Sequence, residues 1–272
     1  MIVQFSYKAP TSMEQLLSLL GKDGATYKLL AGGTDLLVGI RNGVYAPTQV
    51  IDLKKIPGFD LISWDEKGDL VMGPAVTINA MLFDKRVQEH FPLLCACGKD
   101  LASYQIRNRA TVVGNIVNAS PCSDMAPALL CLDARVRIES LQGSREVAIG
   151  AFFTGVKRTV LGKGELVSAI TIPSSMADKA GVYRKLKRIQ GHDLGIVGVA
   201  VVNLGKSARV AVSSSAPTPV ITPELPLTLG LDKMLKEVEA IIRPISDVRC
   251  SKEYRQFMVG EYAKRLWMEV IA

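Results

Sequence analysis

Two short glycine-bearing segments constrain this chain more than any other feature of its sequence. Residues 31–35 read Ala-Gly-Gly-Thr-Asp and residues 111–115 read Thr-Val-Val-Gly-Asn, and each follows residues that could end a strand or form a tight connection. A diphosphate is bound by backbone N–H groups, which can approach it closely only where side chains are missing, as at Gly32, Gly33 and Gly114. We therefore expect the two segments to be halves of one phosphate-binding site.

The residues around these glycines support a nucleotide cofactor as the first hypothesis. Thr34, Thr111 and Asn115 offer short donor side chains, and residues 35–40 read as a helix start, whose free N–H groups and dipole favour an anion. The alternative is an ordinary strand-to-helix turn in which Asp35 or Thr34 caps the helix. Taken singly, either segment is better explained by that alternative.

The composition is that of an ordinary globular protein. The chain has 272 residues, of which 48% are apolar and 22% charged, enough for two or three units with their own cores. The longest apolar stretch near the middle, residues 194–202, is far shorter than the roughly 20 residues that cross a bilayer, and it reads as a buried strand. Residues 1–8 lack the features of a signal peptide, so we expect a cytoplasmic protein with no membrane span.

Cysteine and histidine usage argues against metal and hydrolytic chemistry. The cysteines are Cys95, Cys97, Cys122, Cys131 and Cys250. Their odd number and the lack of a Cys-x-x-Cys pair speak against a disulfide framework, and their spacing matches no common iron–sulfur motif. We expect them to be buried as small apolar residues. The two histidines, His90 and His192, form no zinc-binding pattern and no Ser-His-Asp order.

The net charge of +7 would permit nucleic-acid binding, but its distribution does not favour it. In the densest basic stretch, residues 183–188, cations alternate with apolar side chains, which is typical of a half-buried strand rather than a basic arm. No nucleic-acid-binding motif accompanies it. We therefore expect no nucleic-acid partner, and a charge that serves an acidic cofactor or an acidic partner subunit.

The order of helical and strand patterns predicts an α+β fold in three units, at residues 1–57, 58–175 and 176–272. The first unit reads as a β-α-β motif with the first glycine segment at its strand-to-helix turn. In the second unit we predict a hairpin at residues 61–64 and 70–73, helices at 78–87, 93–103 and 125–132, and strands that include 166–172. In the third we predict strands at residues 183–188, 198–204 and 209–213 and amphipathic helices at 231–242 and 254–270.

Taken together, these pieces resemble the flavoprotein (medium) subunit of the molybdenum hydroxylases, the family of xanthine dehydrogenase, carbon monoxide dehydrogenase and nicotinate dehydrogenase. Residues 29–36 look like that family's first FAD pyrophosphate loop and residues 106–115 look like its second. The match runs over nearly the whole chain and includes tail residues 215–219 and 246–255. The resemblance implies a two-part FAD-binding domain of the PCMH (vanillyl-alcohol-oxidase-like) type, followed by a small α+β carboxy-terminal domain of antiparallel sheet plus helices.

The resemblance also implies which residues hold the cofactor. Asp124 matches the family's aspartate on the sugar portion of FAD, Val167 the apolar residue that flanks the flavin, and Lys185 the lysine near the flavin ring. Without the resemblance, Asp124 would be read as a helix N-cap and Lys185 as a strand lysine that reaches solvent. The full set of cofactor-binding residues is Leu29, Leu30, Ala31, Gly32, Gly33, Thr34, Asp35, Leu36, Thr111, Val113, Gly114, Asn115, Asp124, Val167 and Lys185. No catalytic and no metal-binding residue is expected in this chain.

Val113 departs from the family pattern. The second loop of this family commonly has Gly-Gly before the asparagine, and here the first of the pair is Val113. Because a β-branched residue disfavours positive φ, we expect position 113 to be β-like or the loop to bind slightly differently. The inserted loop with four cysteines that some members carry is not present in this sequence.

The function implied by the resemblance is that of an FAD-binding electron-transfer subunit of a larger enzyme. Non-covalent FAD would take electrons from the [2Fe-2S] clusters of a small subunit, which receives them from a molybdenum-pterin cofactor in a large subunit, and pass them to NAD or another acceptor. Two alternatives stay open. One is a self-contained FAD oxidase or reductase of the same flavin fold, which would need its own substrate base. The other is a non-catalytic remnant that has lost the flavin, for which Val113 is the support.

Overall fold

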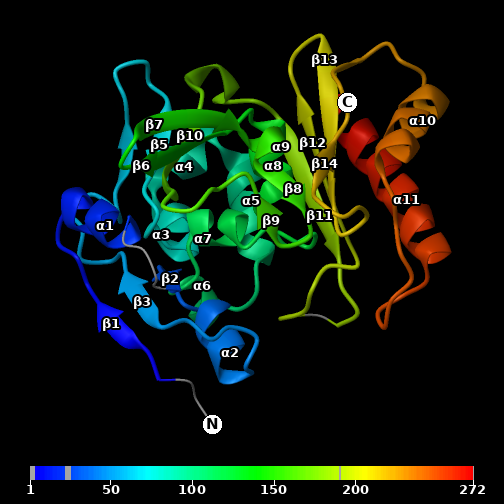
Figure 1. Ribbon diagram of the computed structural model, residues 1–272. Helices are drawn as coiled ribbons and strands as arrows, with labels where there is room; N and C mark the ends of the chain where they lie inside the picture. The colour runs from blue at the N-terminus through cyan, green and yellow to red at the C-terminus, as the bar shows by residue number, and fades with distance from the viewer. Residues whose placement is uncertain (1–3, 22–25, 190, 272) are drawn as a thin grey trace.

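The structure is a computed structural model that describes residues 4–21, 26–189 and 191–271 (Figure 1). Three large sheets follow one another along the chain, with strand orders β1-β3-β2, β4-β5-β10-β6-β7 and β11-β12-β13-β14, which we call the first, second and third sheets. Helices pack around all three, so the α+β class is confirmed. The division at residues 57 and 175 stays a prediction, and residues 1–3 of the amino-terminal segment lie outside the described chain.

The first sheet contains the predicted β-α-β motif. Its elements are β1 (Ser6–Lys8), α1 (Met13–Leu20), β2 (Tyr27–Leu30), α2 (Leu36–Arg41) and β3 (Gln49–Asp52). Helix α1 begins where Ser12 Oγ accepts a hydrogen bond from Gln15 N at 3.2 Å, and its Leu16 and Leu20 are buried against Ile51. Both β1 and β2 pair parallel to β3. The residues that follow β2 and β3 therefore emerge at the same edge of the sheet.

The second sheet is antiparallel and is covered by short helices. The elements of this part of the chain are β4 (Ile62–Trp64), β5 (Leu70–Met72), α3 (Ile78–Phe83), α4 (Lys85–His90), α5 (Pro92–Asp100), α6 (Tyr104–Arg107), α7 (Val112–Val117), α8 (Ala126–Cys131), β6 (Arg135–Ser140), β7 (Gly143–Ala148), α9 (Ile149–Phe152), β8 (Phe153–Gly155), β9 (Arg158–Thr159), β10 (Leu166–Ile172) and the 3₁₀ turn η1 (Ser174–Met176). Strands β8 and β9 pair with each other in a separate two-stranded sheet. The predicted hairpin is confirmed as β4 and β5. Strand β10 pairs with β5 on one side and β6 on the other, which places it at the centre of the sheet.

Two of the predicted helices were too long. The helix predicted at residues 78–87 is broken at Asp84, which has φ −69° and ψ 119° and accepts a hydrogen bond from Val87 N at 2.9 Å. The extended backbone of Asp84 therefore ends α3, and its side chain caps the start of α4. The helix predicted at residues 93–103 ends at Asp100, and Ser103 caps α6 by accepting from Ile106 N at 3.3 Å. In both places a capping side chain interrupts an apolar pattern that continues through it.

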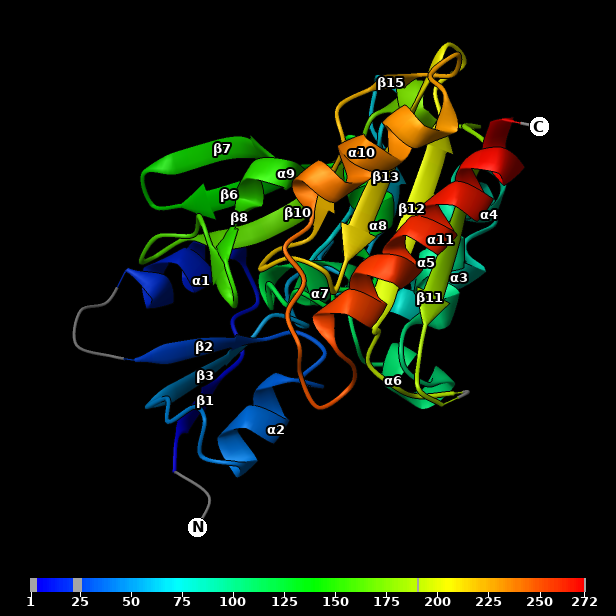
Figure 2. The same cartoon turned by 90° about the vertical axis from the view of Figure 1, so that its right-hand side faces the viewer.

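The third sheet is buried on both faces. Its elements are β11 (Gly181–Leu186), β12 (Val197–Asn203), β13 (Ser207–Ser213), β14 (Val220–Ile221), β15 (Leu225–Pro226), α10 (Leu231–Ile241) and α11 (Lys252–Ile271). Figures 1 and 2 show α10 and α11 along one face and α5 and α8 against the other. Along β12, Val199 and Val201 pack with Trp267 of α11, whereas Ala200 and Val202 belong to the core of the second sheet. In the described residues, no helix is long and apolar enough to cross a membrane.

Candidate functional site

The first glycine segment lies at the carboxyl edge of the first sheet, between β2 and α2. Leu53 N donates to Leu30 O at 3.0 Å, so the parallel pairing extends to the last residue of β2. Gly33 has φ +78°, a conformation that glycine adopts without strain, and turns the chain into α2. Asp35 precedes α2, but its side chain makes no capping hydrogen bond. The capping explanation of this segment therefore lacks its defining contact.

The backbone N–H groups of this segment are available to an anion. Within the described chain, the N–H groups of Gly32, Gly33, Thr34 and Asp35 donate to no protein atom. The first three of these residues are half-buried, so their donors lie in a partly closed surface rather than in the core. Successive free donors on a glycine-rich turn form the kind of concavity that binds phosphate oxygens. The residues present therefore fit a diphosphate.

The second segment leads directly into a helix. Thr111 is the N-cap of α7 and accepts a hydrogen bond from Gly114 N at 2.9 Å. Thr111 also bridges to Thr77, and Ile78 N donates to Ala110 O at 2.8 Å, so the residues before α7 are held like a strand. Thr111 is buried. Its hydroxyl is thus engaged in capping the helix, not free in an open loop.

Val113 does not adopt the β-like conformation that was one of our two expectations, and the other, a loop that binds slightly differently, stays a prediction. It lies in the first turn of α7, is not among the residues with positive φ, and is buried. The expectation of a β-like residue was wrong because the Thr111 cap starts the helix one residue earlier. A valine at this position buries its side chain in the core. Its backbone N–H, like those of the first segment, donates to no atom of the described chain.

At Gly32 the first glycine segment touches the backbone just before the second, at Arg109 and Ala110. A Cβ at Gly32 would overlap the carbonyl group of Arg109 and lie against Cα of Ala110. We expected Gly32 to leave space for a diphosphate, but the space of its missing side chain is filled by the backbone of Arg109 and Ala110. Glycine is needed at this position because two backbones pass in contact. The structure therefore places the first segment against the residues that lead into the second.

Asn115 connects α7 to the segment that contains Asp124. Its Oδ1 accepts from Ser123 Oγ at 2.6 Å and from Met125 N at 3.3 Å. Ser123 Oγ in turn accepts from Ala126 N at 3.2 Å and so helps to start α8. Asn115 thus links the second glycine segment to the turn before α8.

Asp124 and Lys185 form an ion pair between the second and third sheets. Lys185 Nζ lies 2.8 Å from Asp124 Oδ1, and the two side chains are 2% and 13% exposed. Burial raises the pKa of Asp124, and the charge of Lys185 opposes that shift. Asp124 is not the N-cap of α8, which is Met125, and Lys185 does not reach solvent. Both alternatives that rest on local sequence are therefore wrong.

Val167 lies near the start of β10 and is only 4% exposed. It pairs with Ile138 of β6, and the register shifts between Val167 and Ala169. Its side chain belongs to the core of the second sheet, against which α7 packs. A place for Val167 beside a flavin ring stays a prediction.

The family models now decide the identity of the chain. The model described as "FAD binding domain in molybdopterin dehydrogenase" matches residues 3–175. This chain belongs to the FAD-binding medium subunits of the molybdenum hydroxylases. A second model, "CO dehydrogenase flavoprotein C-terminal domain", matches residues 181–270 of the medium subunit. The predicted order of an FAD-binding domain and a carboxy-terminal domain of antiparallel sheet and helices is confirmed.

Individual relatives match this medium subunit over nearly its whole length. The carbon monoxide dehydrogenase medium chain of Hydrogenophaga pseudoflava is 32% identical over 276 residues, 96% of this chain and 95% of the relative. A putative xanthine dehydrogenase FAD-binding subunit of Escherichia coli is 31% identical over 281 residues, 98% of this chain and 96% of the relative. A solved carbon monoxide dehydrogenase from H. pseudoflava, lacking the Mo-pyranopterin moiety of its cofactor, has a TM-score of 0.91 at 30% identity and covers 99% of this chain and 98% of that chain.

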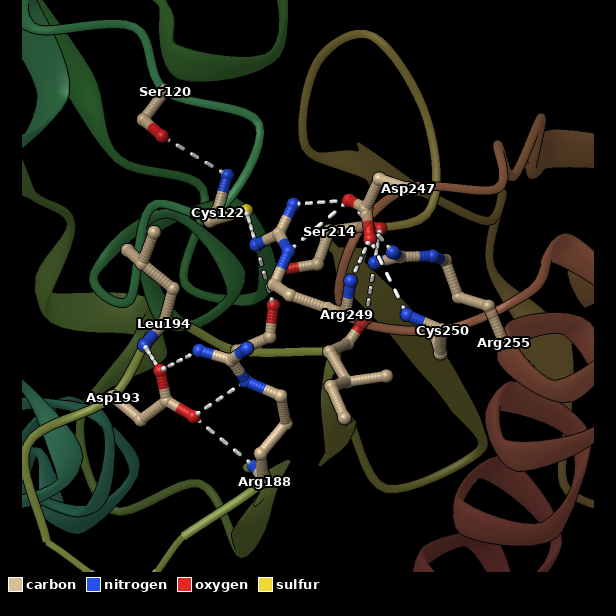
Figure 3. Close-up of polar contacts among 12 residues, drawn as sticks. Ser120, Cys122, Arg188, Asp193, Leu194, Ser214, Asp247, Arg249, Cys250 and Arg255 are labelled. Atoms are coloured by element: carbon tan, nitrogen blue, oxygen red, sulfur yellow. Dashed lines mark hydrogen bonds and ion pairs between the residues drawn. The ribbon is translucent and has the colours of Figure 1, made fainter.

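Sequence reasoning assigned no role to a charged cluster beside residues 120–124 of this medium subunit (Figure 3). Arg249 donates from Nη1 to Cys122 Sγ at 3.2 Å and from Nη2 to Asp247 Oδ2 at 2.6 Å. The hydrogen bond from Arg249 is the main cause that lowers the pKa of Asp247 to about 2. Asp247 is therefore a carboxylate at neutral pH and holds Arg249 against Cys122.

Arg255 completes this cluster from α11. It is 1% exposed, lies 3.1 Å from Asp247 Oδ2 through Nη2, and donates from Nη1 to Ser214 O at 2.8 Å. Ser214 N in turn donates to Pro121 O at 2.7 Å. The signal in the sequence was the family match of residues 246–255, which located the cluster without showing what it contacts.

The cysteines lie in two settings. Cys95, Cys97 and Cys131 are buried, as expected, and burial raises the pKa of Cys131 to about 12. Cys122 and Cys250 are half-buried, so the expectation of burial was wrong for these two. Across residues 4–21, 26–189 and 191–271, no three His, Cys, Asp or Glu side chains are grouped so that they could hold a metal ion.

Proposed function

We propose that this medium subunit binds FAD non-covalently where its two glycine segments meet. The observation that carries the proposal is the row of free backbone donors at Gly32, Gly33, Thr34 and Asp35, in a segment that contacts the backbone of Arg109. A diphosphate supplies the oxygens that these donors lack. The flanking residues of the proposed site are Leu29, Leu30, Ala31, Leu36, Thr111, Val113, Gly114, Asn115, Asp124, Val167 and Lys185.

The roles of these residues follow from their surroundings. The first segment would bind the diphosphate, Thr111 and Asn115 keep α7 and the turn before α8 in place, and Asp124 would bind the sugar portion. Lys185 already has a carboxylate partner 2.8 Å away, so its field at a nearby flavin is that of an ion pair rather than a lone cation. Bound FAD would supply the redox chemistry, and these residues would bind and orient it.

The electron-transfer role is proposed from the relatives. Those reported above are a medium chain of carbon monoxide dehydrogenase and an FAD-binding subunit of a putative xanthine dehydrogenase. By extension, this subunit would accept electrons from the [2Fe-2S] clusters of a small subunit, in a complex whose large subunit carries a molybdenum-pterin cofactor. It would pass them to NAD or another acceptor. The cytoplasmic location stays a prediction.

An absorbance spectrum of the purified full chain tests the cofactor. We expect the bands of oxidised flavin, and acid precipitation should release all of the flavin as FAD because no covalent link is proposed. Flavin that stays with the precipitated protein would contradict non-covalent binding. A colourless protein that stays colourless after FAD is added would overturn the function and favour the remnant.

Purification of the tagged chain from its own host tests the complex. We expect a small and a large polypeptide to copurify, with iron, acid-labile sulfide and molybdenum in the preparation. A flavin-loaded chain that purifies alone and oxidises substrates without these metals would favour the self-contained enzyme instead. Reduced complex mixed with NAD then shows directly whether NAD is the acceptor.

A further inference from the structure

Lys54, which lies outside the set of predicted site residues, contacts the first glycine segment. Its Nζ donates to Ala31 O at 3.1 Å and lies 2.7 Å from Asp52 Oδ1. Lys54 follows β3 just as Ala31 follows β2, and the two strands are parallel neighbours. The contact is therefore a direct product of the parallel pairing, which brings both strand ends to one edge.

Asp52 fixes the position of the Lys54 side chain. Asp52 is 6% exposed, accepts from Tyr7 Oη at 2.6 Å, and accepts from Lys54 N at 3.0 Å. Burial disfavours the charged form of Asp52, but hydrogen bonds from Lys54 and Tyr7 outweigh it and lower the pKa of this carboxyl. The ammonium group is thus held between a buried carboxylate and the Ala31 carbonyl, although 35% of the Lys54 side chain is exposed.

The contact at Ala31 determines where the next N–H group points. The peptide between Ala31 and Gly32 is planar and trans, so its C=O and N–H point in opposite directions. With Ala31 O directed at Lys54, the N–H of Gly32 is directed to the opposite side. A charged donor on the carbonyl also polarises the peptide and makes its N–H a stronger donor. Gly32 has no room to shift toward the backbone of Arg109.

We propose that Lys54 is a positioning residue of the diphosphate site, which directs the Gly32 N–H toward the diphosphate through its hold on Ala31 O. This inference rests on the FAD binding proposed above. Lys54 acts on the ligand through the Ala31–Gly32 peptide rather than by direct attraction between its ammonium group and the diphosphate, because Asp52 compensates that charge. Its loss should therefore weaken binding of any ligand that contains the diphosphate and leave the flavin ring alone.

The test is equilibrium binding of FAD, ADP and riboflavin to the flavin-free full chain, followed by fluorescence or calorimetry. ADP has the diphosphate without the flavin, and riboflavin has the flavin without the diphosphate. Lys54→Met should weaken FAD and ADP binding about tenfold, the equivalent of the hydrogen bond that a misdirected Gly32 N–H no longer donates to the diphosphate. Riboflavin binding should stay unchanged. Lys54→Arg, which keeps a charged donor, should retain most of the affinity for FAD.

Two variants control for charge and for folding. Lys55→Met makes the same charge change at the adjacent exposed position and should bind all three ligands like the wild type. Asp52→Asn with Lys54→Met removes both charges, so its remaining loss of FAD affinity measures the lost contact without an unpaired carboxylate. Thermal unfolding shows that each variant is folded.

Three results would overturn the inference. The first is an FAD affinity of Lys54→Met equal to that of Lys55→Met. The second is a loss of riboflavin affinity in Lys54→Met as large as its loss of FAD affinity. The third is a wild-type affinity for FAD in the double variant Asp52→Asn with Lys54→Met. A wild-type chain that binds neither FAD nor ADP is a different result, since it refutes the proposed function itself and this inference with it.

Discussion

Lys185 and Asp124 join the third sheet to the turn before α8 through a buried ion pair of 2.8 Å. Lys185 Nζ also donates to Asp100 O at 3.3 Å, at the end of α5. Burial raises the pKa of Asp124 even with the cation beside it, so the carboxylate depends on Lys185 for its charge. The pair is therefore a structural connection as well as a candidate contact for the cofactor.

Replacing Lys185 alone should destabilise the chain more than replacing both partners. Lys185→Met leaves a buried carboxylate without its cation, which should lower the free energy of unfolding at pH 7 by about 3 kcal/mol. Asp124→Asn with Lys185→Met removes both charges and should recover most of this loss. Urea unfolding of the flavin-free chain measures both. The loss of unfolding free energy in Lys185→Met should become smaller as the pH falls, because protonation of Asp124 removes the unpaired charge. A loss that does not change with pH would contradict this account.

Two glycine substitutions should separate packing at the site from backbone strain. Gly32→Ala places a Cβ on the Arg109 carbonyl, so the two segments must move apart, at a cost of about 1–3 kcal/mol, and FAD affinity should fall. Gly43→Ala is the control, since Gly43 has φ +72° but no described atom lies within 4 Å of an added Cβ. It should destabilise the chain by about 1 kcal/mol through strain and leave FAD affinity intact. Equal FAD affinity in both variants would refute the contact between the segments as part of the site.

Arg249 should promote alkylation of Cys122. A guanidinium that donates to a sulfur favours the thiolate, the form that iodoacetamide alkylates, so Arg249→Met, which removes the donor 3.2 Å from Cys122 Sγ, should slow the labelling of Cys122 several-fold. Peptide mapping by mass spectrometry distinguishes Cys122 from Cys250, which is also half-buried. Arg265→Met, on the exposed side of α11, is the matched control and should label like the wild type. An unchanged labelling rate of Cys122 in Arg249→Met would contradict a direct influence of the Asp247–Arg249 cluster on Cys122.

The Asp247 cluster should stabilise the fold down to strongly acidic pH. The pKa of Asp247 is lowered from 3.8 to about 2 in the folded chain, so its contribution is complete above pH 4 and is lost as the pH falls toward 2. A shift of this size corresponds to about 2 kcal/mol. Asp247→Asn should therefore be less stable than the wild type at pH 6, and the difference should narrow between pH 4 and pH 2. Denaturant unfolding at several pH values measures it, and a constant difference would show that the charge plays no part.

Local patterns predicted the parts of the fold that local chemistry determines. The β-α-β motif, the β4–β5 hairpin and the two amphipathic helices of the third sheet were all visible in the alternation of apolar residues. The break at Asp84 was missed because the apolar pattern continues through it while a side-chain cap decides the boundary. Val113 was misjudged because the Thr111 cap, a local signal, was not used.

The site could be located from sequence but not assembled. The glycine segments predicted both halves of the candidate site, yet nothing in either shows that Gly32 meets the backbone of Arg109. The contacts from Lys54 to Ala31 and from Arg249 to Cys122 join residues 23 and 127 positions apart. Such pairs depend on strand order and on how the sheets pack, which spacing along the chain does not encode.

Strand β12 is buried on both faces, and this limits how far residues 3–175 and 181–270, the parts matched by the two family models, can be exchanged independently. Ala200 and Val202 belong to the core of one sheet and Val199 and Val201 to the core of another, so a single strand closes both. A chain cut before β11 would lose one wall of the amino-terminal core and expose its apolar surface to water. Grafting the tail of a relative onto residues 3–175 would therefore have to match the side chains of α5 and α8 that it covers. Recombination within this family should succeed only where the third sheet is exchanged together with the side chains of α5 and α8 that pack against it.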